Sequence, residues 1–437
     1  MRSNAFHLAW FLQGSSVQAW GERWTGNISE EWMVPDLFLD LARSMERACF
    51  DYMLLEDTSY VGEAYGNSRD IYLKYGMSVP RQDPSVVGTL MIAATQRLGI
   101  VPTFATYSYP PYLVARLLGS MDQVSQGRAG WNMVTGSSDF VVKNFGRDRL
   151  PEHDTRYDMA DEYIDIVKKL WDSWPLDSMI ADRESGILCD PTKVHAINYE
   201  GRYYKCRGPL NSGPLPQGHA VIAQAGGSPR GKRFAAQHAD TVVAHVKGVD
   251  QMKKYRDDIS IMMREFGRDP KTCKVLFLVA PVLADTAEEA QERASQRVAQ
   301  AEKHLDTRLA ALAKITNIDF AKMDLDAPVG ELSTNGHQQS LAEFLRKAGK
   351  STLRQAITDY SSSGLSVDLV GTPDHVAAQM GEVMEQIGGD GFLFSLPNTS
   401  RRTIAEITDG LVPALQQRGL TRRAYGHKMF RDNLLEF

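Results

Sequence analysis

Short apolar runs alternate with longer amphipathic segments along the whole sequence, and this rhythm limits the folds that are open to it. Eight runs have the length and apolar character of strands, and the segments between them carry apolar residues at helical spacing. Strands that alternate with helices pair in parallel through right-handed crossovers. With eight such units, we predict a closed (β/α)8 TIM barrel rather than an open sheet. The predicted strands are residues 6–12, 51–55, 98–106, 129–135, 221–224, 241–246, 274–282 and 391–395.

Three excursions interrupt this rhythm, at about residues 58–83, 175–218 and 304–372. A chain of 437 residues is long for one domain, but α/β barrels with insertions reach this length. We therefore expect a single barrel domain over residues 1–437. The excursions 58–83 and 304–372 are too long for simple connections, so we expect them to form lids over a site.

The composition argues against several other classes of protein. The net charge of -5 provides no basic surface for nucleic acid, and no apolar run is long enough to span a membrane. The first residues lack the apolar core of a signal peptide. The four cysteines are scattered without a CxxC pair, which argues against a zinc site and a disulfide scaffold, so we expect no metal. A reducing cytoplasm is the expected location.

In a parallel barrel, catalytic side chains lie at the carboxyl ends of the strands. Asn132 lies in an apolar strand, where its amide needs a partner because burial without one is costly. A ligand edge or a neighbouring polar side chain could supply that partner. Asp57 could accept from a ring N–H of a ligand or pair with an arginine. The strand-end rule selects Gln13, Asp57, Thr103, Thr106, Asn132, Thr135, Ser228 and His245.

Two segments could bind a phosphate. Residues 145–174 predict a polar loop and a long helix, with Asp154 or Thr155 as its N-cap. His153 and Tyr157 share one face if the helix reaches back to His153. Gly226-Gly227-Ser228 lies between the fifth strand and its helix, where the glycines allow close approach and Ser228 can cap the helix or bind phosphate. Ordinary capping and packing would explain the same residues.

Motifs of a protein nucleophile or a common nucleotide site are missing from the sequence. It has no GxSxG, HExxH or GxxxxGK[ST], and no GxGxxG after a strand. His245 and His337 are isolated in sequence. The remaining signals favour a bound cofactor that carries the difficult chemistry.

The sequence resembles the flavin-dependent monooxygenases of nitrilotriacetate, EDTA and dibenzothiophene sulfone, within the bacterial-luciferase-like superfamily. Matching segments run in order from about residue 6 to 420 and include SMERACFDYMLLED, YPPYLVARLLGSMDQVSQGRAGWNMVTGSS, EHDTRYDMADEYIDIVKKLWDSW and AQAGGSPRGKRFAA. The resemblance implies a luciferase-like barrel, FMN used in reduced form, O2 as co-substrate and a separate NAD(P)H:FMN reductase. It also implies a homodimer or homotetramer. The expected reaction oxygenates a small organic substrate next to a heteroatom and breaks a C–S, C–N or C–halogen bond.

Carried over by matching position, the resemblance also implies a flavin shell, with His153, Tyr157 and Ser228 near the phosphate and the others nearer the ring or the phosphate loop. We take four further residues as candidates for the substrate side. The shell is Asp57, Thr103, Asn132, His153, Tyr157, Gly227 and Ser228, and the substrate-side candidates are His245, His337, Gln13 and Tyr60.

The sequence departs from its relatives at three places, which puts a sulfone substrate in doubt. Many relatives have a histidine-containing segment that ends in AWRHP, and this sequence keeps Ala19-Trp20 but lacks both histidines. It also has Leu54 and Ile315 where the sulfone enzymes have an aromatic residue and a histidine. Three other functions remain open: a deazaflavin-dependent dehydrogenase on the same barrel, a non-catalytic flavin-binding protein, and a sugar-phosphate barrel enzyme.

Overall fold

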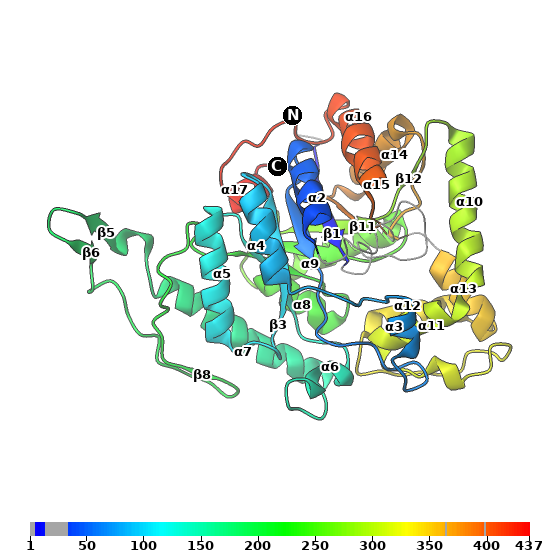
Figure 1. The fold of residues 1–437 in the computed structure, drawn as a ribbon, viewed down its shortest axis with the longest axis horizontal. Coiled ribbons are helices and arrows are strands. Elements are labelled where there is room, and N and C mark those ends of the chain that lie inside the picture. The colour runs from blue at the N-terminus through cyan, green and yellow to red at the C-terminus, as the bar shows by residue number, and fades with distance from the viewer. Residues whose placement is uncertain (1–4, 14–33, 363–364, 397–398) are drawn as a thin grey trace.

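The computed structural model describes residues 5–13, 34–362, 365–396 and 399–437. Within these ranges eight parallel strands close a barrel in the order β1–β2–β3–β4–β9–β10–β11–β14, and β14 pairs with β1 (Figure 1). The predicted (β/α)8 barrel is thus confirmed. The strands are β1 (His7–Leu12), β2 (Tyr52–Leu55), β3 (Gly99–Ala105), β4 (Gly130–Val134), β9 (Val221–Gln224), β10 (Thr241–Ala244), β11 (Lys274–Val279) and β14 (Gly391–Phe394).

The seventh predicted strand is shorter than expected. Residues 274–282 divide into β11 and a separate strand β12 (Val282–Leu283), which pairs with β13 (Val370–Gly371) outside the barrel. Pro281 precedes β12 and has no N–H for the strand ladder, so the barrel strand cannot continue through it. The segment that contains Ala19-Trp20 lies outside the described residues.

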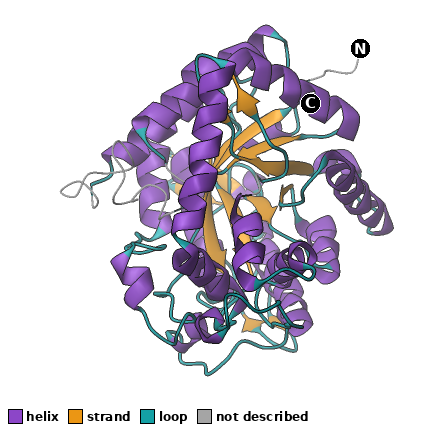
Figure 2. Cartoon of the chain, turned by 90° about the vertical axis from the view of Figure 1, so that its right-hand side faces the viewer, coloured by secondary structure: helices purple, strands orange, loops and turns teal. Residues whose placement is uncertain are grey.

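Helices between successive strands form a layer around the barrel (Figures 1 and 2). The final helical segment is not one regular α-helix, because the π-helical turn η4 (Glu406–Leu411) separates α15 (Arg401–Ala405) from α16 (Val412–Gln417). Pro413 cannot donate within a regular helix and its ring would clash with the preceding turn, which the wider π turn relieves. The other layer helices are α2 (Asp36–Arg47), α4 (Pro84–Ala94), α5 (Pro111–Ser125), α7 (His153–Asp172), α8 (Pro229–His238), α9 (Val249–Glu265) and α14 (Pro373–Ile387).

The barrel interior is closed at the amino ends of its strands by α17 (Phe430–Leu434). Phe430 packs against Gly99 and Gly130, and a Cβ at Gly99 would lie only 2.7 Å from its ring. Inward-facing residues such as Tyr52, Leu54 and Leu276 fill the space above it and are fully buried. With this end filled, the carboxyl ends of the strands are left for a ligand.

The predicted excursions carry secondary structure of their own. Residues 58–83 contain α3 (Asp70–Lys74), and residues 175–218 contain two hairpins, β5 (Met179–Asp182) with β6 (Ile187–Cys189) and β7 (Tyr199–Glu200) with β8 (Lys205–Cys206). After α10 (Ala287–Lys303), residues 304–372 form α11 (Leu305–Thr316), α12 (Gln338–Ala348) and α13 (Leu353–Ser362), which share a separate apolar core. The single-domain organisation stays a prediction.

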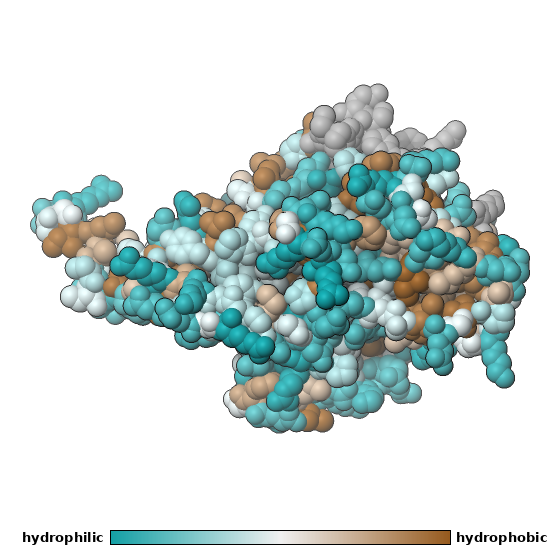
Figure 3. Space-filling model, turned by 90° about the horizontal axis from the view of Figure 1, so that it is seen from below, coloured by the Kyte–Doolittle hydropathy of each residue, from teal (hydrophilic) through white to brown (hydrophobic). Residues whose placement is uncertain are grey.

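The hairpin β5–β6 projects as an arm from the body of the molecule (Figure 1, left). Figure 3 shows apolar side chains on its surface. The exposed large apolar residues of this arm are Leu176, Met179, Ile180, Ile187 and Leu188. Among the described residues, no helix has the length and apolar character to cross a membrane.

Candidate active site

A cavity of about 240 Å³ lies between the carboxyl ends of the barrel strands and the insertion 304–372. Strand ends contribute Thr103, Asn132 and Gln224, while α7 contributes His153 and Tyr157. The insertion contributes Lys314, Ile315 and residues 336–339. The end of the barrel that the sequence selected is therefore the end that holds this cavity.

Most predicted site residues meet in this cavity, which is lined by Asp57, Tyr60, Thr103, Asn132, His153, Tyr157, Gly227, Ser228 and His337. Gln13 and His245 follow strands at the same end of the barrel but do not line it. Gln13 Nε2 lies 3.5 Å from Ser395 Oγ, and His245 Nδ1 lies 3.7 Å from Glu343 Oε2. The chemical roles of all these residues stay predictions.

Asn132 is fixed by a short chain of hydrogen bonds. Its Nδ2 donates to Thr103 Oγ1 at 2.8 Å, and the Thr103 hydroxyl donates to the Leu55 carbonyl at 2.6 Å. Within the described structure, Asn132 Oδ1 and Gln224 Oε1 are buried and accept no hydrogen bond. Buried acceptors without donors are costly, so a ligand with N–H and O–H groups would satisfy them. A flavin ring and its ribityl chain carry such groups.

Helix α7 begins at His153, so the prediction that Asp154 or Thr155 caps it is wrong. Glu152 is the N-cap, and its side chain makes no capping hydrogen bond. The Glu152 carbonyl already accepts from Arg156 N–H at 3.0 Å, so the N-cap lies two residues before Asp154 and three before Thr155. His153 and Tyr157 consequently share a face, with ring centres 5.2 Å apart.

The Gly226-Gly227-Ser228 loop is shaped by close packing. Ser228 caps α8, as predicted, and its Oγ accepts from Gly231 N–H at 3.0 Å. A Cβ at Gly226 would overlap the Gly231 carbonyl oxygen, and one at Gly227 would overlap the side chain of Gln339. Together with Tyr157 and His153, this loop offers hydroxyl, imidazole and helix-start N–H donors. That donor set fits a phosphate.

Asp57 follows β2 and lines the cavity. Its burial raises the pKa of the carboxyl to about 6, with Glu56 adding to the rise and Arg81 opposing it. Arg81 is engaged with Glu56 at 2.7 Å. A carboxyl with this pKa changes charge close to neutral pH, which suits a group that accepts from or donates to a ligand.

His337 caps helix α12 and is held by Ser340. Its Nδ1 lies 2.7 Å from Ser340 Oγ. Burial, together with the neighbouring His245 and His153, lowers the pKa of the imidazole to about 4. His337 is therefore uncharged at neutral pH and can act there as a hydrogen-bond partner, but not as a cation.

Several residues of the site escaped the sequence reasoning, among them Gln224, Arg156, Lys314 and Gln339. Gln224 ends β9, so the strand-end rule could have selected it. Arg156 Nη1 and Nη2 donate to the carbonyls of Pro151 and Asn335 at 2.8 and 2.9 Å, which ties α7 to the insertion. Of the two substituted positions, Ile315 lines the cavity, whereas Leu54 is buried inside the barrel.

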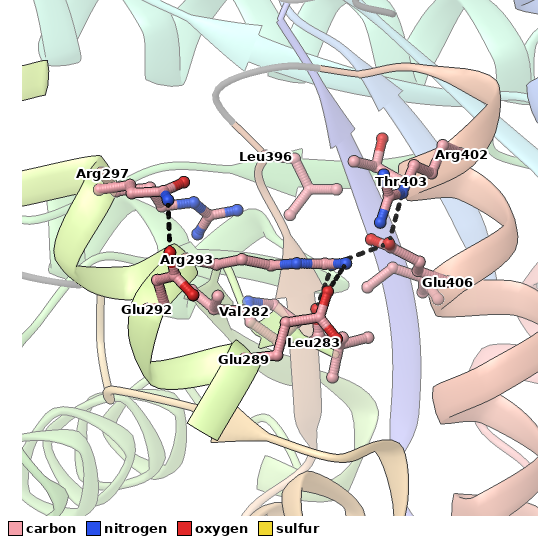
Figure 4. Close-up of a pocket in the computed structure, with 13 residues that line it drawn as sticks. Val282, Leu283, Glu289, Glu292, Arg293, Arg297, Leu396, Arg402, Thr403 and Glu406 are labelled. Atoms are coloured by element: carbon pink, nitrogen blue, oxygen red, sulfur yellow. Dashed lines mark hydrogen bonds and ion pairs between the residues drawn. The ribbon is translucent and has the colours of Figure 1, made fainter. Parts of the chain in front are cut away.

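A larger cavity, of about 510 Å³, lies between α10 and α15 (Figure 4). At its centre Arg293 contacts Glu289 at 2.7 Å and Glu406 at 3.0 Å. These charges satisfy one another, unlike the orphaned acceptors beside Asn132, so we place the candidate site in the smaller cavity. Across the described ranges, His, Cys, Asp and Glu form no group of three or more that could hold a metal ion.

The chain is similar in sequence and in fold to known proteins. The model of a family described as luciferase-like monooxygenase matches residues 15–391. Dibenzothiophene-sulfone monooxygenase of Rhodococcus erythropolis (strain XP) is 34% identical over 98% of this chain and 96% of its own length. Nitrilotriacetate monooxygenase component A of Aminobacter aminovorans is 32% identical over 98% and 96%. A solved structure of riboflavin lyase with modified FMN and riboflavin superposes with a TM-score of 0.89, at 29% identity, over 99% of this chain and 96% of that one.

Proposed function

The chain belongs to the luciferase-like monooxygenase family and is a flavin-dependent monooxygenase, and on that premise we propose a more specific reaction. It uses reduced FMN and O2 to oxygenate a small organic substrate next to a heteroatom, so that a C–S, C–N or C–halogen bond breaks. The single observation that carries this proposal is the pair of orphaned acceptors, Asn132 Oδ1 and Gln224 Oε1, in a cavity that also offers phosphate donors.

The residues of the cavity divide into a phosphate end and a ring end. His153, Tyr157, Ser228 and the backbone of Gly227 would hold the phosphate of FMN, while Asp57, Thr103 and Asn132 would lie at the ring. When bound, reduced FMN supplies the electron pair with which one oxygen atom of O2 enters the substrate and the other leaves as water.

The protein's own contribution is orientation, proton control and exclusion of water. Thr103 fixes Asn132, so that its acceptor oxygen is directed without further reorganisation. Asp57, with a pKa of about 6, can hold or release a proton at its carboxyl near neutral pH. The insertion covers the cavity through Ile315 and His337, which limits access of water to the reacting atoms.

We propose that a separate NAD(P)H:FMN reductase supplies the reduced flavin. The name of the Aminobacter relative, component A of a monooxygenase, supports a second component in that system. To test this, the chain and a reductase are placed on opposite sides of a dialysis membrane in the presence of NADH and FMN. Substrate-dependent oxygen uptake across the membrane supports transfer of free reduced FMN, while uptake only after direct mixing requires a complex.

We further propose a homodimer or homotetramer in which the β5–β6 arm takes part. The arm exposes Ile180 and Leu188, which are more apolar than a solvated hairpin requires. Light scattering on the wild type and on an Ile180→Asp, Leu188→Asp double variant measures the assembly. A wild-type oligomer that the double variant reduces to monomers supports the proposal, and a monomeric wild type contradicts it.

The decisive experiment is an anaerobic titration with reduced and with oxidised FMN, followed by mixing with O2 while flavin spectra are recorded. Tighter binding of reduced than of oxidised FMN supports the monooxygenase. So does reoxidation of the flavin by O2 that is coupled to oxidation of one of the heteroatom substrates screened. Tight binding of oxidised FMN without substrate-dependent oxygen use would indicate a flavin-binding protein. Binding of a deazaflavin in place of FMN would indicate a dehydrogenase.

A further inference from the structure

Lys314 is a buried cation in the wall of the candidate site. It lies in the last turn of α11, only 8% of the residue is exposed, and it lines the cavity. Its Nζ lies 5.6 Å from the centre of the Tyr60 ring, and the Tyr60 hydroxyl donates to the Lys314 backbone carbonyl at 2.9 Å. The side chain is thus fixed by packing against a second residue of the cavity.

The ammonium group has no anionic partner in the described part of the chain. Its Nζ makes neither an ion pair nor a hydrogen bond there, although Glu56 and Asp57 are near enough to raise its pKa. Glu56 is already paired with Arg81 at 2.7 Å. Burial is the larger effect and lowers the pKa of Lys314 to about 8, so the group stays mostly protonated at neutral pH. A buried ammonium without an acceptor is costly, which points to a ligand that supplies one.

The position of Lys314 points to the substrate rather than to the flavin. The residues proposed for FMN come from strand ends, α7 and the Gly226-Gly227-Ser228 loop. Lys314 comes instead from helix α11 of the insertion, beside Ile315. Ile315 is one of the positions at which this chain departs from the sulfone enzymes.

We propose that Lys314 binds an anionic group of the substrate, a carboxylate or a sulfonate, and so selects organic oxyanions over neutral molecules. This inference rests on the proposed function, in which the substrate occupies the space between the flavin and the insertion. A single buried ammonium group discriminates strongly between an anionic ligand and its neutral analogue, because the neutral analogue leaves the ammonium unpaired.

Ligand perturbation of the flavin spectrum tests this selectivity. The FMN-loaded protein is titrated with benzenesulfonate and benzoate, and with their neutral counterparts benzenesulfonamide and benzamide. The wild type is expected to bind each anion about ten- to hundredfold more tightly than its amide. Lys314→Gln should abolish this preference and Lys314→Arg should largely keep it. Lys350→Gln, an exposed change in the same insertion, should have no effect.

A second measurement needs no flavin. Reductive methylation of the flavin-free protein, followed by peptide mass spectrometry, gives the rate at which Lys314 reacts. Benzenesulfonate should slow methylation of Lys314 about tenfold and leave Lys350 unchanged, while benzenesulfonamide should protect neither. Equal rates with and without the sulfonate would overturn the inference.

The outcomes separate the two proposals. If FMN fails to bind the wild type, the proposed function fails, while the methylation arm still decides the role of Lys314. If FMN binds but anions and amides bind equally, or neither probe binds, the inference about Lys314 fails alone. If Lys314→Gln weakens binding of reduced FMN and leaves the probe preference intact, Lys314 serves the cofactor and the inference is wrong.

Discussion

Asn132 is held in one orientation by Thr103, whose hydroxyl oxygen accepts from the Asn132 amide at 2.8 Å. This contact leaves Asn132 Oδ1 as a fixed acceptor without a donor in the described structure. If it accepts from the flavin, Asn132→Ala should weaken FMN binding by about 1–3 kcal/mol, since the ligand donor then loses its partner. Flavin fluorescence titration measures the change.

Thr103→Val refines this prediction. It keeps the Asn132 acceptor but frees its orientation, so the expected loss of affinity is smaller, about 0.5–1.5 kcal/mol. Thr89→Val serves as the matched control, because the exposed Thr89 hydroxyl bonds only to the Ser85 carbonyl of its own helix. Wild-type affinity in Asn132→Ala would show that the flavin does not use this amide.

Arg156 connects α7 to the insertion through the main chain and side chain of Asn335. Arg156→Met should therefore loosen the insertion, because it leaves the carbonyl and amide oxygens of Asn335 without donors and removes one of the two donors to the Pro151 carbonyl. We expect a loss of about 2–4 kcal/mol in unfolding free energy, with faster hydrogen exchange at residues 333–340. The exposed Arg264→Met provides the control. Unchanged exchange at residues 333–340 would mean that the insertion is held by its apolar contacts alone.

Gly226 is required by the backbone of its own loop. In Gly226→Ala the new methyl group would overlap the Gly231 carbonyl oxygen, and backbone atoms cannot move aside as a side chain can. We expect about 1–3 kcal/mol of destabilisation, together with weaker FMN binding, from urea unfolding and fluorescence titration. Gly330→Ala is the control, because a Cβ at that position meets nothing within 4 Å. Equal stability of the two variants would contradict this account of the loop.

The barrel was predictable because its strands are short, apolar and separated by helices with a clear apolar face. The same local signals misled where a tertiary or backbone effect prevailed. Pro281 ends a strand that the apolar pattern predicted to run to residue 282, and helix α7 begins at His153, before the side chains best suited to cap it. In each case the residue responsible is visible in the sequence, but its effect depends on hydrogen bonds that apolar periodicity does not report.

The site, too, contains some residues that the sequence could predict and others that it could not. Asn132 and Asp57 could be chosen because the carboxyl ends of parallel strands converge wherever the barrel closes. Lys314 and Gln339 could not, because they lie on insertion helices whose placement over the barrel depends on contacts between distant segments. From the sequence alone, a lysine on such a helix is expected to be exposed to solvent. Only the structure, in which Tyr60 packs against Lys314, shows that this lysine is buried.

Asp57 makes stability depend on pH in a defined direction. Burial raises its pKa from 3.8 to about 6 in the folded protein. Between these two pH values the folded chain binds more protons than the unfolded chain, so the unfolding free energy falls as pH rises. The stabilising effect of the protonated form is complete below the unfolded pKa and is lost once pH passes about 6.

Asp57→Asn removes this titration and should therefore stabilise the flavin-free protein more at neutral pH than in mild acid. From the shift in pKa, the gain in unfolding free energy should be about 1–2 kcal/mol larger at about pH 7.5 than at about pH 5. Urea unfolding at both pH values measures it, with the exposed Glu382→Gln as control. A gain that is the same at both values would show that the Asp57 carboxyl titrates alike in the folded and unfolded chains. If Asp57 also contacts the flavin, the same variant should bind FMN less tightly while it is more stable, a combination that a purely structural carboxylate would not produce.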